Sequence, residues 1–221
     1  MNFFTFLTFS AIAIAITQLL VFSLPENAPK FYHAGLLAIF IQWFVFVHAS
    51  GILFGNAPTE KFYDLTGSIT FQTLIVYTIV SRTSEMSLRQ ILLSSCVLIW
   101  SIRLGSYLFF RIIKEGGIDS RFTEVKKDRW YFCLFWTIQG LWCFITSFPV
   151  LWLNTTVDLG TSHLNSLDIF GFFLWLSGFA IEVISVLANE YFCLHTRLFF
   201  VFTNSVLTQY QLCTNLVLTL D

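Results

Sequence analysis

Residues 100–130, WSIRLGSYLFFRIIKEGGIDSRFTEVKKDRW, pass from an apolar segment into the most basic loop of the chain. Seven of the twelve Lys and Arg residues lie within this stretch: Arg103, Arg111, Lys114, Arg121, Lys126, Lys127 and Arg129. Arg103 lies well inside the apolar segment, where a charged side chain is costly and is usually functional. Gly116 and Gly117 follow, and adjacent glycines allow the backbone a close approach that other residues forbid. The stretch therefore predicts a membrane helix that continues into one half of a cofactor site.

The composition of the whole chain is that of a polytopic membrane protein. Of its 221 residues, 56% are hydrophobic and 11% are charged, against about 25% charged in a typical soluble domain. The net charge is −1, and no basic groove with interleaved aromatic residues indicates nucleic-acid binding. The five cysteines are scattered without a CxxC pair, which favours small apolar packing residues over a disulfide framework or a zinc site. They are Cys96, Cys133, Cys143, Cys193 and Cys213.

Six apolar stretches are long enough to cross a hydrocarbon core of about 30 Å. They are predicted at residues 3–24, 32–54, 65–81, 90–113, 131–153 and 169–187. A further stretch at 198–220 contains four side-chain amides, which are costly in a membrane without partners, so a poor seventh span and an interfacial segment both stay open. The predicted fold is an all-α membrane protein, a bundle of six transmembrane helices with this seventh as an alternative.

The distribution of positive charge predicts the orientation of the bundle. The loop at 114–129 holds five Lys and Arg residues, whereas the loop at 154–168 holds none. Since positively charged loops stay on the cytosolic side, the first loop is predicted in the cytosol and the second outside or in the lumen. Counting spans back places the N-terminus and the 55–64 loop in the cytosol as well. Residues 154–156, Asn-Thr-Thr, form a glycosylation sequon on the opposite side, close to the membrane.

The fourth predicted span carries ionisable groups along one face. Arg103, Tyr107 and Arg111 are spaced at i, i+4 and i+8, and each step turns the helix by only about 40°. Because Arg side chains facing lipid are unfavourable, this face is predicted to look into the bundle. Two alternatives stay open. Arg111 snorkels to the headgroups, and Arg103 forms a structural salt bridge, with Glu182 as the candidate partner, instead of binding a ligand.

Tyr63 and Asp64 directly precede the third predicted span. Asp is strongly preferred at a helix N-cap, and this role is favoured for Asp64. The alternative is that both side chains face a pocket. In that case they would meet Asp119 and Arg121 of the basic loop, because both loops are predicted on the cytosolic face.

Several motifs resemble those of the steroid 5-alpha reductase superfamily in their order and spacing. They are Phe-Tyr-Asp followed by LTGS at 62–68, RLGSYLFFRI at 103–112, Gly-x-Asp-Ser-Arg-Phe at 117–122, FWTIQGLW at 135–142 and GFAIE at 178–182. The resemblance covers roughly residues 30–185. Within the superfamily, the motifs most resemble those of a branch of uncharacterised membrane proteins with a steroid 5-alpha reductase-like C-terminal domain.

The resemblance implies a multi-helix membrane oxidoreductase that reduces a lipid or sterol C=C bond with NADPH. Eukaryotic members usually lie in the endoplasmic reticulum; the cofactor enters from the cytosol and a lipid-like substrate enters from the membrane. No metal is implied. Carried over by position, the cofactor-binding residues would be Arg103, Arg111, Asp119 and Arg121. Glu182 would line the pocket, and Tyr63 and Tyr107 are candidate proton donors on their chemistry alone.

The chain departs from the family pattern after Glu182. The family continues with polar and basic positions and an Arg-His-Pro-x-Tyr motif, whereas this chain continues with Val186, Leu187 and a Phe-, Leu- and Val-rich tail. The predicted organisation is an incomplete reductase-like domain at 1–185 and a divergent tail at 186–221, hypothesised to come from an alternative or mis-read exon. The alternative functions are a catalytically inactive truncated isoform, a methyltransferase-like relative of the same architecture, and a transporter.

Overall fold

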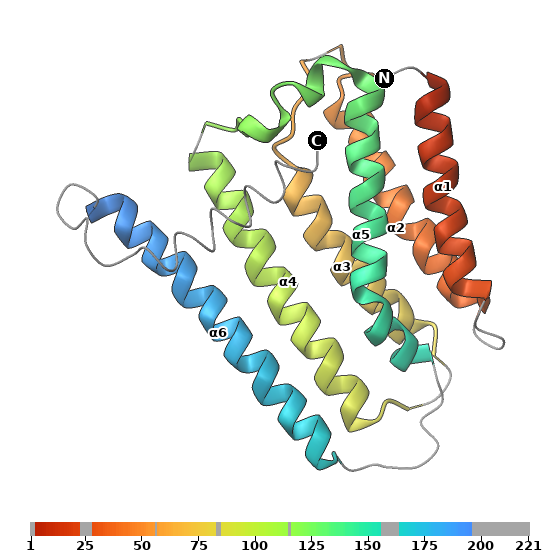
Figure 1. Cartoon of the computed structure of the whole chain (residues 1–221), viewed down its shortest axis with the longest axis vertical. Coiled ribbons are helices and arrows are strands. Elements are labelled where there is room, and N and C mark those ends of the chain that lie inside the picture. The colour runs from red at the N-terminus through yellow and green to blue at the C-terminus, as the bar shows by residue number, and fades with distance from the viewer. Residues whose placement is uncertain are drawn as a thin grey trace. The chain divides into compact units, whose positions relative to one another are not determined.

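The computed structural model describes residues 3–22, 28–55, 57–82, 85–114, 116–155 and 164–195, and within these ranges all regular secondary structure is helical (Figure 1). The elements are α1 (Phe3–Phe22), α2 (Ala28–Ala49), α3 (Tyr63–Val80), α4 (Leu88–Lys114), η1 (Ser120–Phe122), η2 (Val125–Lys127), α5 (Arg129–Thr155) and α6 (Ser166–His195). The chain forms two compact units, residues 1–164 and residues 165–221, and α6 belongs to the second.

Each of the six predicted spans coincides with one α-helix. Most helix ends lie within three residues of the predicted ones. The largest difference inside the first unit is at α2, which ends at Ala49 instead of residue 54. Gly51 and Gly55 have φ values of 73° and 67°, a left-handed conformation that ends helices and favours glycine. The candidate seventh span at 198–220 lies outside the described residues.

Three helices are long and apolar enough to cross a membrane, and they fit an integral membrane protein. They are α4, α5 and residues Ser166–Ala188 of α6. In the described part of the chain, α1 and α2 contribute only shorter apolar stretches, Phe3–Ile12 and His33–Ala49. At 18 residues, α3 is barely long enough, and it carries polar side chains including Asp64 and Gln72. Six transmembrane crossings therefore stay a prediction.

Helix α3 packs against α2, α4 and α5. Its residues Thr66, Gly67 and Ser68, from the LTGS motif, are all buried. Ser68 Oγ donates to the Ser101 carbonyl oxygen on α4 at 2.5 Å. On the side facing α2, Gln42 Nε2 donates to Thr70 Oγ1 at 2.9 Å. Side-chain hydrogen bonds of this kind are the means by which polar helices associate in a membrane.

Glycines bring these helices close together. A Cβ added at Gly67 of α3 would overlap the Gln139 amide of α5, and one added at Gly105 of α4 would overlap Ser68 Cβ and Oγ. A Cβ at Gly140 of α5 would lie 3.1 Å from the Ala38 carbonyl oxygen of α2. Gly67, Gly105 and Gly140 lie in three of the motifs quoted above, so these motifs contact one another or neighbouring helices as packing sites.

A buried polar network joins the end of α3, the beginning of α4 and the end of α5. Asn154 is fully buried, and its Nδ2 donates to Ser94 Oγ at 3.0 Å and to Thr78 Oγ1 at 3.2 Å. The last carbonyls of α5 also have side-chain donors: Gln90 Nε2 donates to the Leu153 oxygen at 2.7 Å, and Arg82 donates to the Asn154 oxygen. These donors satisfy carbonyl groups that a helix end otherwise leaves unpaired.

We expect no glycan on Asn154. N-glycosylation modifies the Asn Nδ2 and occurs on surface loops, whereas this nitrogen is buried and donates two hydrogen bonds. The third residue of the sequon, Thr156, lies outside the described residues. Expression in a glycosylation-competent cell, followed by treatment with a glycosidase, should leave the electrophoretic mobility of the chain unchanged and equal to that of Asn154→Gln. A glycosidase-sensitive shift that Asn154→Gln removes would contradict this expectation.

The second unit begins with a reciprocal helix cap. The backbone N–H of Asp168 donates to Asn165 Oδ1 and the backbone N–H of Asn165 donates to Asp168 Oδ2, both at 2.9 Å. This is the arrangement of a capping box, which fixes the start of α6. The helix then runs through residue 185 to His195 without a break. The predicted domain boundary at 185/186 therefore falls within a helix, and the exon hypothesis stays a prediction.

Candidate functional site

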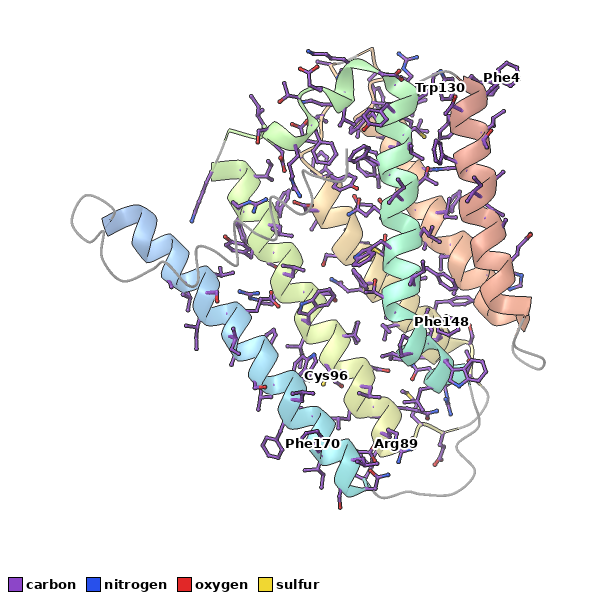
Figure 2. The ribbon with its side chains drawn as sticks, in the orientation of Figure 1. Phe4, Arg89, Cys96, Trp130, Phe148 and Phe170 are labelled. Carbon is purple, nitrogen blue, oxygen red and sulfur yellow. The ribbon has the colours of Figure 1, made fainter. Side chains whose placement is uncertain are left out.

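A cluster of charged side chains lies at one end of the first unit. It joins the segment before α3, the last turns of α4 and the loop that carries η1 and η2. Figure 2 labels Trp130 at the start of α5, which follows this loop directly. The carboxylates of the cluster are Glu60, Asp64 and Asp119, and the cations paired with them are Arg111, Arg121 and Lys126. The basic stretch and the loop before the third predicted span do meet, as the sequence predicts.

Arg121 is held mainly by Asp119. Arg121 Nε donates to Asp119 Oδ1 at 3.0 Å and to Oδ2 at 2.9 Å, and Nη2 donates to Oδ2 at 2.5 Å. The backbone N–H of Arg121 also donates to Asp119 Oδ1, which caps η1. Burial raises the pKa of Asp119, but the hydrogen bonds from Arg121 outweigh it and hold the pKa below its ordinary value. The same bonds raise the pKa of Arg121. Both groups are therefore charged at neutral pH.

Asp64 receives two guanidinium groups from different elements. Its Oδ2 lies 3.1 Å from Arg121 Nη2 and 3.8 Å from Arg111 Nη2. The favoured prediction that Asp64 caps α3 is wrong, because Phe62 occupies the N-cap position and no side chain caps this helix. Asp64 is instead the second residue of α3, and a carboxylate in the first turn is still favoured by the helix dipole. The alternative, that Tyr63 and Asp64 both face a pocket, stays a prediction; the structure shows the Asp64 carboxylate in contact with Arg121 of the basic loop and with Arg111.

Glu60 is a member of the cluster that the sequence did not single out. It is only 3% exposed, yet its Oε2 lies 2.6 Å from Lys126 Nζ and its Oε1 accepts the backbone N–H of Asp119 at 2.9 Å. This one carboxylate therefore ties the segment before α3 to both ends of the basic loop. The available signal was an acidic residue that precedes the third predicted span on the same side as the basic loop.

Phe122 anchors the loop in the bundle. It is 3% exposed, and its ring lies 4.7 Å from the ring of Tyr63 and 5.9 Å from that of Phe135. Tyr63 is itself engaged, because its hydroxyl donates to the Phe135 carbonyl oxygen at 3.1 Å. Burial raises the pKa of Tyr63, and the nearby negative charge of Asp64 raises it further. The phenol therefore stays neutral at physiological pH. To protonate a substrate, Tyr63 would have to exchange this hydrogen bond.

Gly116 and Gly117 have a local role. Their backbone N–H groups donate to the carbonyl oxygens of Ile113 at 3.1 Å and Ile112 at 2.7 Å. With φ values of 77° and 80°, they form the hydrogen-bond pair of a Schellman motif at the end of α4. A Cβ at Gly117 would overlap the flexible Lys61 side chain. The close approach predicted at these glycines is thus made by the chain itself.

Two other predicted site residues, Arg103 and Tyr107, lie on α4 before the last turn that carries Arg111. Arg103 is eight residues before Arg111 on α4, which is about 12 Å along the helix axis. Its guanidinium carbon lies 5.9 Å from the centre of the Tyr107 ring, a cation–π contact one turn away. Glu182 lies on α6, in the other unit. Whether Arg103, Tyr107 and Glu182 take part in one site stays a prediction.

Three buried polar side-chain atoms of α2 and α5 have no hydrogen-bond partner among the described residues. They are Gln42 Oε1, Trp136 Nε1 and Gln139 Oε1. Hydrogen bonds of the amide nitrogens fix the orientations of both glutamine side chains. Gln139 Nε2 donates to the Tyr63 carbonyl oxygen. Gln42 Nε2 donates to the Thr70 hydroxyl, which itself donates to the Thr66 carbonyl oxygen. Trp136 and Gln139 lie in the FWTIQGLW motif, which was the available signal for them.

An oxyanion that binds the cations of this cluster would compete with the carboxylates that already pair with them. Within the described residues, Arg121 is paired with Asp119 and Asp64, and Lys126 is paired with Glu60. No group of three or more His, Cys, Asp or Glu side chains in that part of the chain is arranged to hold a metal ion.

Comparison with known proteins gives one match. Residues 55–217 match the family described as "Protein of unknown function (DUF1295)". No curated protein and no solved structure matches the chain. The matched range includes α3, the whole charged loop, α5 and α6, and it runs past the domain boundary predicted at 185/186. Since the match covers well over half of the 221 residues, the chain belongs to the DUF1295 family.

Proposed function

We propose that this protein is a multi-pass membrane oxidoreductase of the steroid 5-alpha reductase type, which reduces a C=C bond of a lipid or sterol with NADPH. The observation that carries the proposal is the convergence of Arg111 and Arg121 on a single carboxylate oxygen at the end of the bundle. All five motifs that resemble the reductase superfamily, from residue 62 to residue 182, also lie within the matched family region.

The residues present fit a dinucleotide phosphate at Arg111 and Arg121. Guanidinium groups bind phosphate oxygens through paired N–H donors, and two of them on separate elements form a cradle for one anion. The Arg121 side chain is 52% exposed and that of Arg111 is 29% exposed, so both are accessible from outside the bundle. Lys126 is less suited, because its side chain is 20% exposed and paired with the buried Glu60.

When bound, the nicotinamide supplies the hydride. The chain must then bind the phosphates, orient the substrate carbonyl and keep water out. A donor to that carbonyl gains strength in a dry site. Tyr63 and Tyr107 are the candidate donors from the sequence, and Glu182 is the ionisable residue proposed to line the pocket. Trp136 joins them, because its indole N–H is buried without a partner among the described residues.

The proposed location is a membrane with the charged cluster on the cytosolic side, where NADPH is present. In a eukaryotic cell we propose the endoplasmic reticulum, from the reductase resemblance. The basic loop between α4 and α5 supports the orientation, because positive charge favours the cytosolic side. The three long apolar helices supply the lipid-facing surface from which a lipid-like substrate would enter.

Arg121→Ala should weaken NADPH binding at least ten-fold. The substitution removes charge-assisted hydrogen bonds to phosphate, each worth roughly 1.5–3 kcal/mol, and about 1.4 kcal/mol corresponds to a factor of ten. The measurement is a titration of the full chain in detergent with NADPH, followed by nicotinamide fluorescence. The matched control is Lys127→Ala, which removes one positive charge from the same loop but leaves the cluster intact, because Lys127 forms its ion pair with the exposed Glu124, outside the cluster.

The same titration with S-adenosylmethionine separates the alternatives. Binding of S-adenosylmethionine without NADPH would replace the reductase proposal by a methyltransferase-like function. Failure of both ligands to bind a folded chain would favour the inactive isoform. Equal NADPH affinity of Arg121→Ala and the unchanged chain would remove Arg121 from the site.

A further inference from the structure

A single oxygen of Asp64 lies where two guanidinium groups meet. Asp64 Oδ2 is 3.1 Å from Nη2 of Arg121 and 3.8 Å from Nη2 of Arg111. Arg111 comes from the last turn of α4 and Arg121 from η1, so the two cations reach this point from separate elements. An anionic oxygen between two arginines from different segments is also the arrangement by which proteins bind phosphate. Asp64 thus places a carboxylate oxygen where a phosphate oxygen would fit.

The second carboxylate near Arg121 is bound differently. Asp119 is 8% exposed and accepts hydrogen bonds from Nε, Nη2 and the backbone N–H of Arg121. Its own backbone N–H is held by the buried Glu60. Asp119 is therefore part of the loop that sets the direction of Arg121. Asp64 makes only one contact to this guanidinium, and its side chain is 21% exposed.

The two carboxylates should consequently have opposite effects on an incoming anion. Removal of Asp119 would release Arg121 from its fixed direction, which lowers the affinity of any ligand that needs both guanidinium groups. Removal of the Asp64 charge would leave Arg121 supported by Asp119 and would leave the charges of both arginines less compensated. A ligand phosphate would then have no carboxylate to displace.

We propose that Asp64 is an internal competitor for a phosphate site formed by Arg111 and Arg121, and that a phosphate oxygen takes the place of Asp64 Oδ2 when the ligand binds. If the ligand is NADPH, the proposal rests on the proposed function. The phosphate site itself is tested separately, with a simple anion. The ligand class is a phosphate ester or pyrophosphate. The carboxylate sets a threshold, because only an anion that engages both arginines more strongly than Asp64 is bound.

The test compares three variants with the unchanged chain in detergent. Asp64→Asn removes the competing charge and keeps the size of the side chain. Asp119→Asn weakens the support of Arg121. Glu124→Gln removes a negative charge from the same loop at a side chain that is 77% exposed and bound to Lys127, and it is the matched control. Each variant is titrated with inorganic pyrophosphate at constant ionic strength, and binding is followed by calorimetry.

Asp64→Asn should bind pyrophosphate roughly five-fold more tightly, the factor that corresponds to the loss of one partly exposed ion pair. Asp119→Asn should bind it more weakly than the unchanged chain, and Glu124→Gln should bind it with unchanged affinity. The unfolding temperature without anion is recorded for each variant. If Asp64→Asn does not fold, Asp64→Ser is used, and it should show the same tightening.

Weaker pyrophosphate binding by Asp64→Asn, parallel to Asp119→Asn, would overturn the inference and make Asp64 a supporting counter-ion. Equal tightening by Glu124→Gln would also overturn it, because the effect would then be general charge. A repeat with NADPH separates this result from the proposed function. If pyrophosphate binding tightens but NADPH does not bind at all, the phosphate site stands and the reductase proposal fails. If NADPH binds equally to both forms, the reductase proposal stands and the competitor role fails.

Discussion

Gly105→Ala should destabilise the protein by about 1–2 kcal/mol, although alanine is the better helix former. In a helix interior the change from glycine to alanine stabilises by up to about 1 kcal/mol. At Gly105, however, the new methyl group would overlap both Cβ and Oγ of Ser68 on α3. Ser68 Cβ is attached to the backbone and cannot rotate away, so α3 and α4 must separate, and overpacking of this kind costs typically 1–3 kcal/mol. The measurement is the thermal unfolding midpoint of the purified chain in detergent.

Two further variants make this result specific. Ser106→Ala changes an exposed neighbour on the same helix and should leave the unfolding midpoint unchanged. Ser68→Gly combined with Gly105→Ala moves the methyl group to the other side of the same contact and should recover part of the loss. Full recovery is not expected, because Ser68 also donates to the Ser101 carbonyl oxygen. A Gly105→Ala protein that is more stable than the unchanged chain would show that α3 and α4 are not in close contact here.

The glycine contacts show that parts of the motifs that resemble a family of enzymes are buried as helix-packing sites. Gly67 contacts Gln139 and Gly105 contacts Ser68, so LTGS, RLGSYLFFRI and FWTIQGLW meet at α3. The cluster itself contains Arg111 from RLGSYLFFRI, Asp64 from the Phe-Tyr-Asp motif and the Asp-Ser-Arg-Phe element. The motifs that resemble the family therefore contain both residues that pack helices together and residues of the charged cluster. A match to a motif does not by itself show which of the two roles a given residue has.

Helix positions were predictable from the sequence because they depend on local properties. Long apolar runs between Gly, Pro and charged residues predict α1 to α6, and the observed ends differ by a few residues except at α2 and at the end of α6. The meeting of the basic loop with the segment before α3 was also predictable, because positive-inside orientation places both at the same end. The number of membrane crossings was harder to predict from the sequence. Helix α3 is apolar enough to resemble a membrane span, but it is also polar enough to be a packed core helix.

The pairing of charges was not predictable from the sequence. Two of the ion pairs join residues that are 57 and 66 positions apart, Asp64 with Arg121 and Glu60 with Lys126. Only the pairing of Arg121 with Asp119, two positions away, is local in this part of the cluster. The N-cap prediction for Asp64 failed for the same reason. Local preference favoured a cap, and two guanidinium groups from distant segments give the side chain a different contact.

Glu60→Leu should be the most damaging single substitution at the charged end. The Glu60 side chain is 1% exposed and has two partners, Lys126 Nζ at 2.6 Å and the backbone N–H of Asp119 at 2.9 Å. Removal of one member of a buried ion pair costs about 3–5 kcal/mol, because its partners are left without compensation in a place that water reaches poorly. The loop that carries Arg121 loses its attachment at the same time, so NADPH or pyrophosphate binding should fall together with the unfolding midpoint.

Graded controls distinguish the buried pair from general loss of charge. The Glu60→Gln side chain can still accept the hydrogen bond from the Asp119 N–H. The unfolding midpoint of this variant should therefore lie between that of Glu60→Leu and that of the unchanged chain. Glu124→Gln breaks an ion pair whose side chains are 66% and 77% exposed, and such pairs contribute at most about 1 kcal/mol. Equal unfolding midpoints for Glu60→Leu and Glu124→Gln would contradict the burial of Glu60. A large loss of stability in Glu60→Leu with unchanged anion affinity would instead show that the loop keeps Arg121 in place through Phe122 and Asp119 alone.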